Sequence, residues 1–163
     1  PKQSNRDALY RHNIGQYLNF YDRYYPMKLD IVVSPYANET KVFDNISFHT
    51  LAKNNGGHGI DLSTFERFDC NTEYQHSGPV SLVPETNIKK EEREWQLAVP
   101  RNVMSDSSSD LDLFDPSNYD FNQNYYDRMR DKYMIERFEK DGEANLDQFV
   151  VNYINTYFRV SIR

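Results

Sequence analysis

LDQFVVNYINTYFRVSI, residues 146–162, is the strongest fold signal in this chain. It is dense in β-branched and aromatic side chains, which favour strands. Alternate residues of a strand point to the same face. One such face would carry Val150, Ile154, Phe158, Val160 and Ile162. The stretch therefore predicts one long terminal strand, or two strands joined at Asn155.

The segment before it, DRMRDKYMIERFEK at 127–140, fits two structures. Its apolar residues have helical spacing, but they also alternate with polar residues as in a strand. Asp-Gly favours a two-residue hairpin turn, and Asp141-Gly142 lies just before the terminal stretch. We therefore favour a strand here, joined by a hairpin to the last one.

Further strand signals lie upstream. Asp44-Asn45 interrupts the alternation of one segment and is a candidate β-bulge. The strongest turn signal is Asn54-Asn55-Gly56-Gly57, because Asn and Gly tolerate positive φ. The mixed charges of IKKEER suit a solvated turn or a sheet edge. Strand-like segments occupy 28–34, 39–50, 64–74 and 94–99.

These signals predict a mainly β fold, an antiparallel sandwich-like or barrel-like module with short helical segments and an acidic loop. Residues 1–26 would form an arm or short helix, and 27–101 the first part of the β-rich module. Residues 102–124 would form the acidic loop, and 125–163 the strands that complete the module. Five Asp and no Lys, Arg or Glu lie between Ser105 and Asn124. Apolar anchors for insertion into a neighbour would be Leu111, Leu113 and Phe114.

The composition narrows the function classes. The chain has 163 residues and a net charge of −6, which opposes a sequence-reading nucleic-acid binder but not a conduit that repels phosphate. No run approaches the about 20 apolar residues of a membrane span.

Cys70 is the single cysteine, so no internal disulfide forms. The four His residues lack metal-ligand spacing, and phosphate-cradling and nucleophile-elbow motifs are missing. We expect no metal, no cofactor and no catalytic residue.

Three arginines stand out as interface candidates: Arg101, Arg128 and Arg130. The guanidinium fork of Arg suits carboxylate partners. Ion pairing with the acidic loop inside the chain is the simplest interpretation. A clamp between subunits and contact with nucleic acid remain the alternatives.

Several motifs, taken in order, resemble the carboxy-terminal part of the large tail protein of crAss-like bacteriophages, called the stabilisation or muzzle protein. They are scattered over most of the chain from about residue 20 onward. The motifs are YYP at 24–26, TKVFDNI at 40–46, YQHSG at 74–78, WQLAVPR at 95–101 and DRMRDKY at 127–133.

The resemblance implies a structural virion protein of a short-tailed phage. It would be a subunit of a ring at the tail through which DNA is ejected, made in the host cytoplasm and carried in the virion. Its partners would be copies of itself, the remainder of a longer polypeptide, other tail proteins and DNA passing without sequence-specific binding. The sequence begins with Pro rather than Met, which we interpret as a piece of a longer protein, for example a proteolytic fragment.

Two other functions stay open. Aromatic-rich surfaces favour a host-receptor or carbohydrate-binding β-sandwich at the tail tip. An enzyme such as a hydrolase with a carboxylate pair is the third hypothesis, since 25 acidic residues conceal any pair.

Overall fold

The computed structural model describes residues 16–21, 23–103 and 127–161. In these ranges every regular element is a strand. The short helical segments that the sequence predicted are therefore wrong for the described residues, and residues near the start form a small hairpin instead. The strands are β1 (Asn19–Phe20), β2 (Arg23–Tyr24), β3 (Met27–Val33), β4 (Lys41–Asn54), β5 (Arg67–Asn71), β6 (Val80–Ser81), β7 (Ile88–Glu91), β8 (Glu94–Ala98), β9 (Arg130–Asp131), β10 (Met134–Lys140) and β11 (Leu146–Val160).

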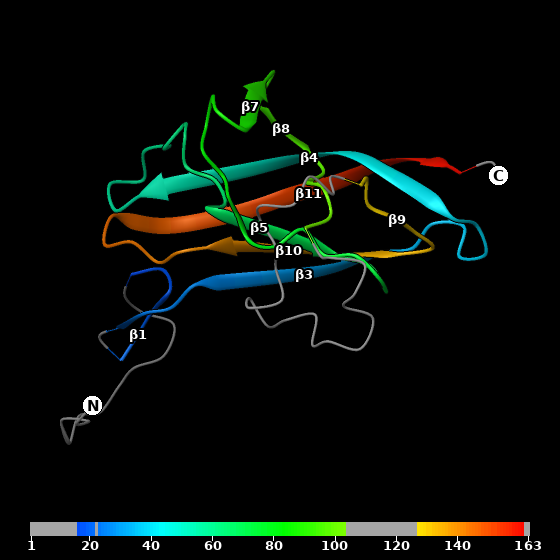
Figure 1. The fold of residues 1–163 in the computed structure, drawn as a ribbon. Helices are drawn as coiled ribbons and strands as arrows, with labels where there is room; N and C mark the ends of the chain where they lie inside the picture. Colours follow the sequence, from blue (N-terminus) through cyan, green and yellow to red (C-terminus); the bar gives the residue numbers. More distant parts are fainter. Residues whose placement is uncertain (1–15, 22, 104–126, 162–163) are drawn as a thin grey trace.

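Two antiparallel sheets face one another as a sandwich (Figure 1). One sheet has the order β3-β10-β5-β6, and the other has the order β11-β4-β8-β7 with β9 paired to β4. The rings of Phe48 on β4 and Phe138 on β10 meet edge to face across the sheets, with centroids 5.6 Å apart. The sandwich-like mainly β prediction is thus confirmed, and no sheet among the described strands closes into a barrel.

An aromatic core fills the space between the sheets. Phe65 lies beside Phe138, with centroids 4.8 Å apart, and meets Phe149 of β11 at 5.3 Å. Such offset and edge-to-face pairs add attraction beyond the area they bury. Trp95 on β8 is fully buried, so the strand predicted from its alternation contributes the largest core side chain.

A β-bulge at Asp44 reverses which face of β4 points inward. Opposite β11, Phe43 and Asn45 pair with consecutive residues, so Asp44 is the extra residue. Before the bulge Phe43 is buried, and after it Ile46 is buried. The predicted bulge is confirmed, but Val42 does not share the inner face with Ile46, because the extra residue shifts the parity by one.

The terminal stretch forms one continuous strand, so the alternative of two strands joined at Asn155 is wrong. Its predicted inner face is confirmed at Ile154 and Phe158, which pack against the core, but differs toward both ends. Register shifts near its start place Phe149 in the core at 6% exposure, whereas Val160 stays 43% exposed.

The hairpin predicted at Asp141-Gly142 is wrong. β10 pairs with β3 and β5, while β11 pairs with β4 in the opposite sheet. The connection is held by Asp141, whose carboxylate accepts two hydrogen bonds from Arg67 at 2.6 and 3.0 Å. A Cβ at Gly142 would lie 3.0 Å from the Tyr24 ring, so the β1–β2 hairpin packs closely on this turn.

Candidate functional site

The bulge on β4 lies beside a polar pocket on the sandwich surface. The Asp44 carbonyl accepts a hydrogen bond from the Val99 N–H at 3.0 Å, and the Phe43 N–H donates to the Met129 carbonyl at 3.0 Å. These backbone bonds bring two segments to the bulge, one after β8 and one before β9. Each segment carries an arginine beside its anchor, Arg101 and Arg128.

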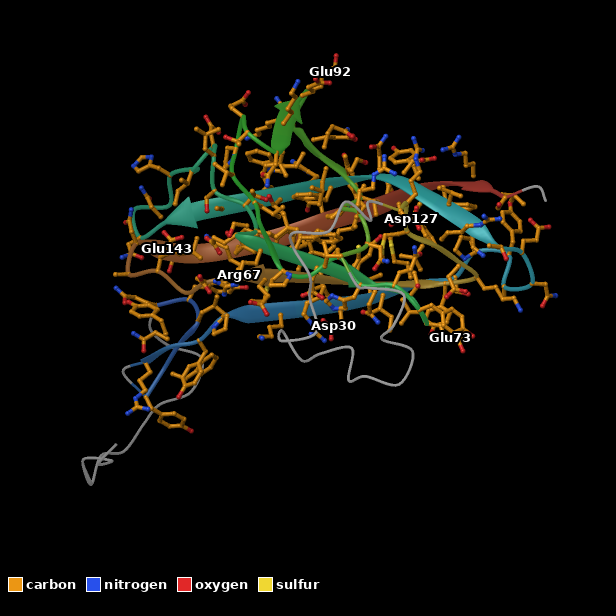
Figure 2. All side chains as sticks on the ribbon, viewed as in Figure 1. Asp30, Arg67, Glu73, Glu92, Asp127 and Glu143 are labelled. Carbon is orange, nitrogen blue, oxygen red and sulfur yellow. The ribbon has the colours of Figure 1, made fainter. Side chains whose placement is uncertain are left out.

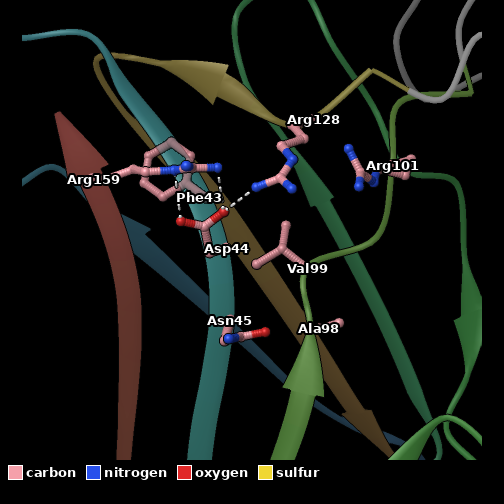
Figure 3. A pocket seen from close by; sticks show the side chains of 8 residues that line it. All are labelled: Phe43, Asp44, Asn45, Ala98, Val99, Arg101, Arg128 and Arg159. Carbon is pink, nitrogen blue, oxygen red and sulfur yellow. Dashed lines mark hydrogen bonds and ion pairs between the residues drawn. The ribbon is translucent and has the colours of Figure 1, made fainter. Parts of the chain in front are cut away.

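The Asp44 carboxylate lies between two arginines (Figure 3). Arg128 Nη1 is 2.7 Å from Asp44 Oδ1. On the other side, Arg159 of β11 approaches Oδ2 with Nε at 3.1 Å and Oδ1 with Nη2 at 3.2 Å. Charge-assisted bonds of this kind fix the orientation of guanidinium groups, so Asp44 aligns both arginines along one rim.

These residues surround a surface pocket of about 520 Å³. Arg101 forms the wall facing Arg128 (Figure 3). Among the described residues the lining contains three arginines and one aspartate, a formal charge of +2 on a chain whose net charge is −6. A local excess of positive charge in a hollow attracts carboxylates and other oxyanions. The lining residues are Phe43, Asp44, Asn45, Ala98, Val99, Arg101, Arg128 and Arg159.

The structure separates the three predicted arginines. Arg101 and Arg128 line the pocket together, whereas Arg130 does not. The Arg130 backbone N–H donates to Gln75 Oε1, and its guanidinium donates to Ser161 Oγ. Arg128 pairs with Asp44 of β4, which lies outside the acidic segment. The other candidates, Leu111, Leu113 and Phe114, lie outside the described residues.

Sequence reasoning missed Arg159. It lies within the apolar terminal stretch and belongs to no motif. The register that opposes Arg159 to Val42, next to the bulge, is a long-range property that the local pattern does not contain. The candidate bulge was the one available signal for this site, because bulges redirect side chains at sheet surfaces.

Cys70 and His76, two residue types that often serve in catalysis, are both buried. Burial raises the pKa of the Cys70 thiol, so the reactive thiolate is disfavoured. Burial, with a smaller contribution from Arg137, lowers the pKa of His76 to about 4, so the ring is neutral at pH 7. His76 Nδ1 accepts a hydrogen bond from the Gly78 N–H at 2.8 Å and stabilises the turn after β5.

Two further properties concern the described part of the chain. Its His, Cys, Asp and Glu side chains nowhere form a group of three that could hold a metal ion. It also contains no helix with the length and apolar character to cross a bilayer.

Comparison with known proteins places the chain in a family. A search of curated proteins finds no match. The family described as the crassvirus muzzle protein C-terminal domain matches residues 15–102, which is more than half of the chain. The matched range includes β4 with its bulge and β8 with Trp95. The sandwich presented here therefore belongs to the crassvirus muzzle protein C-terminal domain family, and the chain is a structural tail protein of a phage.

Proposed function

We propose that this chain is a subunit of the ring-shaped muzzle through which phage DNA is ejected, and that it acts by protein–protein assembly without catalysis. The observation that carries the proposal is the edge of β11 that no described strand pairs with. This strand runs from Leu146 to Val160 and, among the described strands, pairs with β4 alone. A long edge presents unpaired N–H and C=O groups that another polypeptide can pair with.

The side chains along this edge support a protein contact. Tyr153, Tyr157 and Val160 are 37%, 52% and 43% exposed. Tyrosines combine large contact area with a polar end, and they are enriched at interfaces. The partners that fit this edge are a second copy, another part of the same longer polypeptide, or another tail protein.

The charge of the chain supports DNA passage rather than DNA binding. A net charge of −6 repels phosphate overall. DNA would pass without sequence-specific contacts, and the chain would be made in the host cytoplasm before it joins the virion.

The test is made in the phage. Mass spectrometry of purified tails should find this chain, and the double change Tyr157→Lys with Val160→Lys should give particles without an intact muzzle, because edge lysines block strand pairing. Val83→Lys, an equivalent change at a 46% exposed loop residue, is the control and should leave particles intact. Tails that lack the chain, or intact infectious particles with the β11 double variant, would contradict the proposal.

A host-binding or carbohydrate-binding role is the second candidate, favoured by the aromatic residues of the β1–β2 hairpin and its flank. Phe20, Tyr21 and Tyr25 are 54%, 56% and 46% exposed. Exposed aromatic rings are suited to sugar and receptor contacts. Binding of the full chain to host cells or glycan arrays, lost on Tyr25→Ala but not on Tyr74→Ala, would establish this role.

A further inference from the structure

The tip of the β7–β8 hairpin, residues 91–94, carries the opposite charge to the arginine pocket, whereas Lys89 and Lys90 of β7 make the whole hairpin neutral. Glu91, Glu92 and Glu94 lie at its tip, and with Gln96 they line a hollow of about 590 Å³. The tip residues 91–94 comprise three glutamates and Arg93, a formal charge of −2. The described pocket lining carries a formal charge of +2, so the two surfaces are opposite in sign and equal in the size of their charge.

The two charged surfaces lie at opposite ends of one strand. β8 begins at Glu94 beside the tip and ends at Ala98 beside the pocket. A strand of this length rises by about 13 Å, and the two hollows share no lining residue. The same rigid strand therefore presents an acidic projection and a basic hollow at a fixed spacing.

The hairpin is shaped to project. Figure 2 shows Glu92 at the outermost point of the hairpin, away from the sandwich. Glu91 pairs with Glu94, so the turn consists of Glu92 and Arg93 alone, with φ of 47° and 77°. Two consecutive positive φ values define the tight turn for which Asn-Gly is the usual choice. Here charged residues occupy it instead.

The base of the tip is held in place. The Tyr153 hydroxyl of β11 donates to Glu94 Oε1, and Gln96 Nε2 donates to Glu94 Oε2 at 3.3 Å. Lys90 of β7 donates to the Asp61 carbonyl and lies over the Trp95 ring, 5.4 Å from its centroid. This lysine is thus engaged at the side of the sandwich, and the exposed charges of the tip are Glu91, Glu92 and Arg93.

We propose that the glutamate tip of one copy inserts into the arginine pocket of the next copy, joining the chains head to tail. Carboxylates of Glu91 and Glu92 would accept hydrogen bonds from Arg101 and Arg128, and Asp44 would keep Arg128 aligned. Because this contact joins two different surfaces, it repeats from copy to copy and closes into a ring when the rotation permits. The proposal rests on the ring function proposed above and names its subunit contact.

Charge exchange between two variants tests the contact in solution with the full chain. Sedimentation velocity at low salt measures self-association of the wild type, Glu92→Arg and Arg101→Glu. Each reversal should weaken association about tenfold or more, because it opposes like charges. An equimolar mixture of the two variants should regain association, since the reversed charge at position 92 of one variant then meets the reversed charge at position 101 of the other.

Matched controls separate this contact from general effects of charge. Glu85→Arg changes an exposed glutamate in another turn, and Arg23→Glu changes an exposed arginine on β2. Both should associate like the wild type. Glu92→Asn keeps a residue that tolerates positive φ, removes one charge, and should weaken association less than the reversal does.

Several results would overturn the proposal. They are a wild type that stays monomeric at every concentration, reversals that leave association unchanged, and a mixture that does not recover. Loss of oligonucleotide binding by Arg101→Glu with unchanged association would assign the pocket to phosphate instead. The ring function itself is judged separately by the presence of the chain in purified tails, so the two proposals fail by different observations.

Discussion

Glu136 and Lys140 lie on the same strand and the same inner face, yet β10 buries their charges in different ways. Lys140, at the strand end, is 1% exposed, and its ammonium contacts the carboxylates of Glu66 and Glu143, the latter at 2.7 Å. Glu136, at mid-strand, is fully buried and receives one hydrogen bond from Thr156 of the opposite sheet at 2.6 Å. Its second oxygen has no partner among the described residues.

The protonation of the two groups follows from these surroundings. Burial alone would lower the pKa of Lys140, but hydrogen bonds to Glu143 and Glu66 outweigh it and raise the pKa. Burial raises the pKa of Glu136 to about 7, and the Thr156 hydrogen bond opposes this only in part. A buried charge at the end of the strand, such as Lys140, can thus be balanced by partners. A buried acid at the middle of the strand, such as Glu136, is favoured in its neutral form.

Of the changes considered, removal of the Lys140 ammonium should have the largest effect on stability. Lys140→Ala leaves Glu66 and Glu143 without their shared cation, so the free energy of unfolding should fall by about 4 kcal/mol. Urea unfolding at pH 7 measures the loss. A loss below about 1 kcal/mol would show that the ion pairs of Lys140 are as weak as exposed ones.

Neutralisation of the central acid should have the next largest effect. The folded state binds the Glu136 proton more tightly than the unfolded state, so the contribution of Glu136 to stability should fall as pH rises from about 4.5 to 7. Glu136→Gln removes this loss. The stability difference between variant and wild type should therefore shift in favour of the variant by about 3 kcal/mol between pH 4.5 and pH 8. A difference that is independent of pH would show that folding does not shift the pKa of Glu136.

Loss of the bond between the sheets should have a smaller effect. Thr156→Val keeps the shape of the side chain but removes the one donor to Glu136. We expect a loss of about 2 kcal/mol at pH 8, where the acid is charged, and less at pH 4.5. Thermal unfolding at both pH values measures the two losses, and equal losses would contradict the assignment of the bond to the carboxylate form.

The Arg128–Asp44 pair at the sandwich surface should give the smallest effect, and it serves as the reference for an exposed ion pair. Arg128→Ala removes a partner of Asp44, but Arg159 remains beside it. Exposed ion pairs contribute little, so the free energy of unfolding should change by about 0.5 kcal/mol. A change above about 2 kcal/mol in urea unfolding would make the pocket part of the folding core rather than a surface available to a partner.

The comparison also shows which features the sequence could predict. Alternation identified β8, and the Asp44-Asn45 interruption identified the bulge, because both signals are local. The same alternation at 134–140 does not tell which face of the strand is buried. Glu136 and Lys140 are charged, so their residue types would predict exposure to solvent. Only the partners from distant strands make their burial tolerable.

The pairing of distant segments was the part that local signals could not supply. Asp141-Gly142 is a favourable hairpin sequence, yet the chain changes sheets there, because the partners of β10 and β11 lie far away in the sequence. Arg159 joins Arg101 and Arg128 for the same reason. The candidate site was therefore predictable in two of its arginines, but not in its shape.

A cryo-electron microscopy map of the intact tail, at a resolution that traces side chains, tests the assembly role most directly. It should show copies of this sandwich arranged around the DNA exit, with a polypeptide covering the β11 edge and the Glu92 hairpin of each copy seated at Arg101 of its neighbour. A tail in which this domain stands apart from other copies, with the edge and the pocket both facing solvent, would contradict that role.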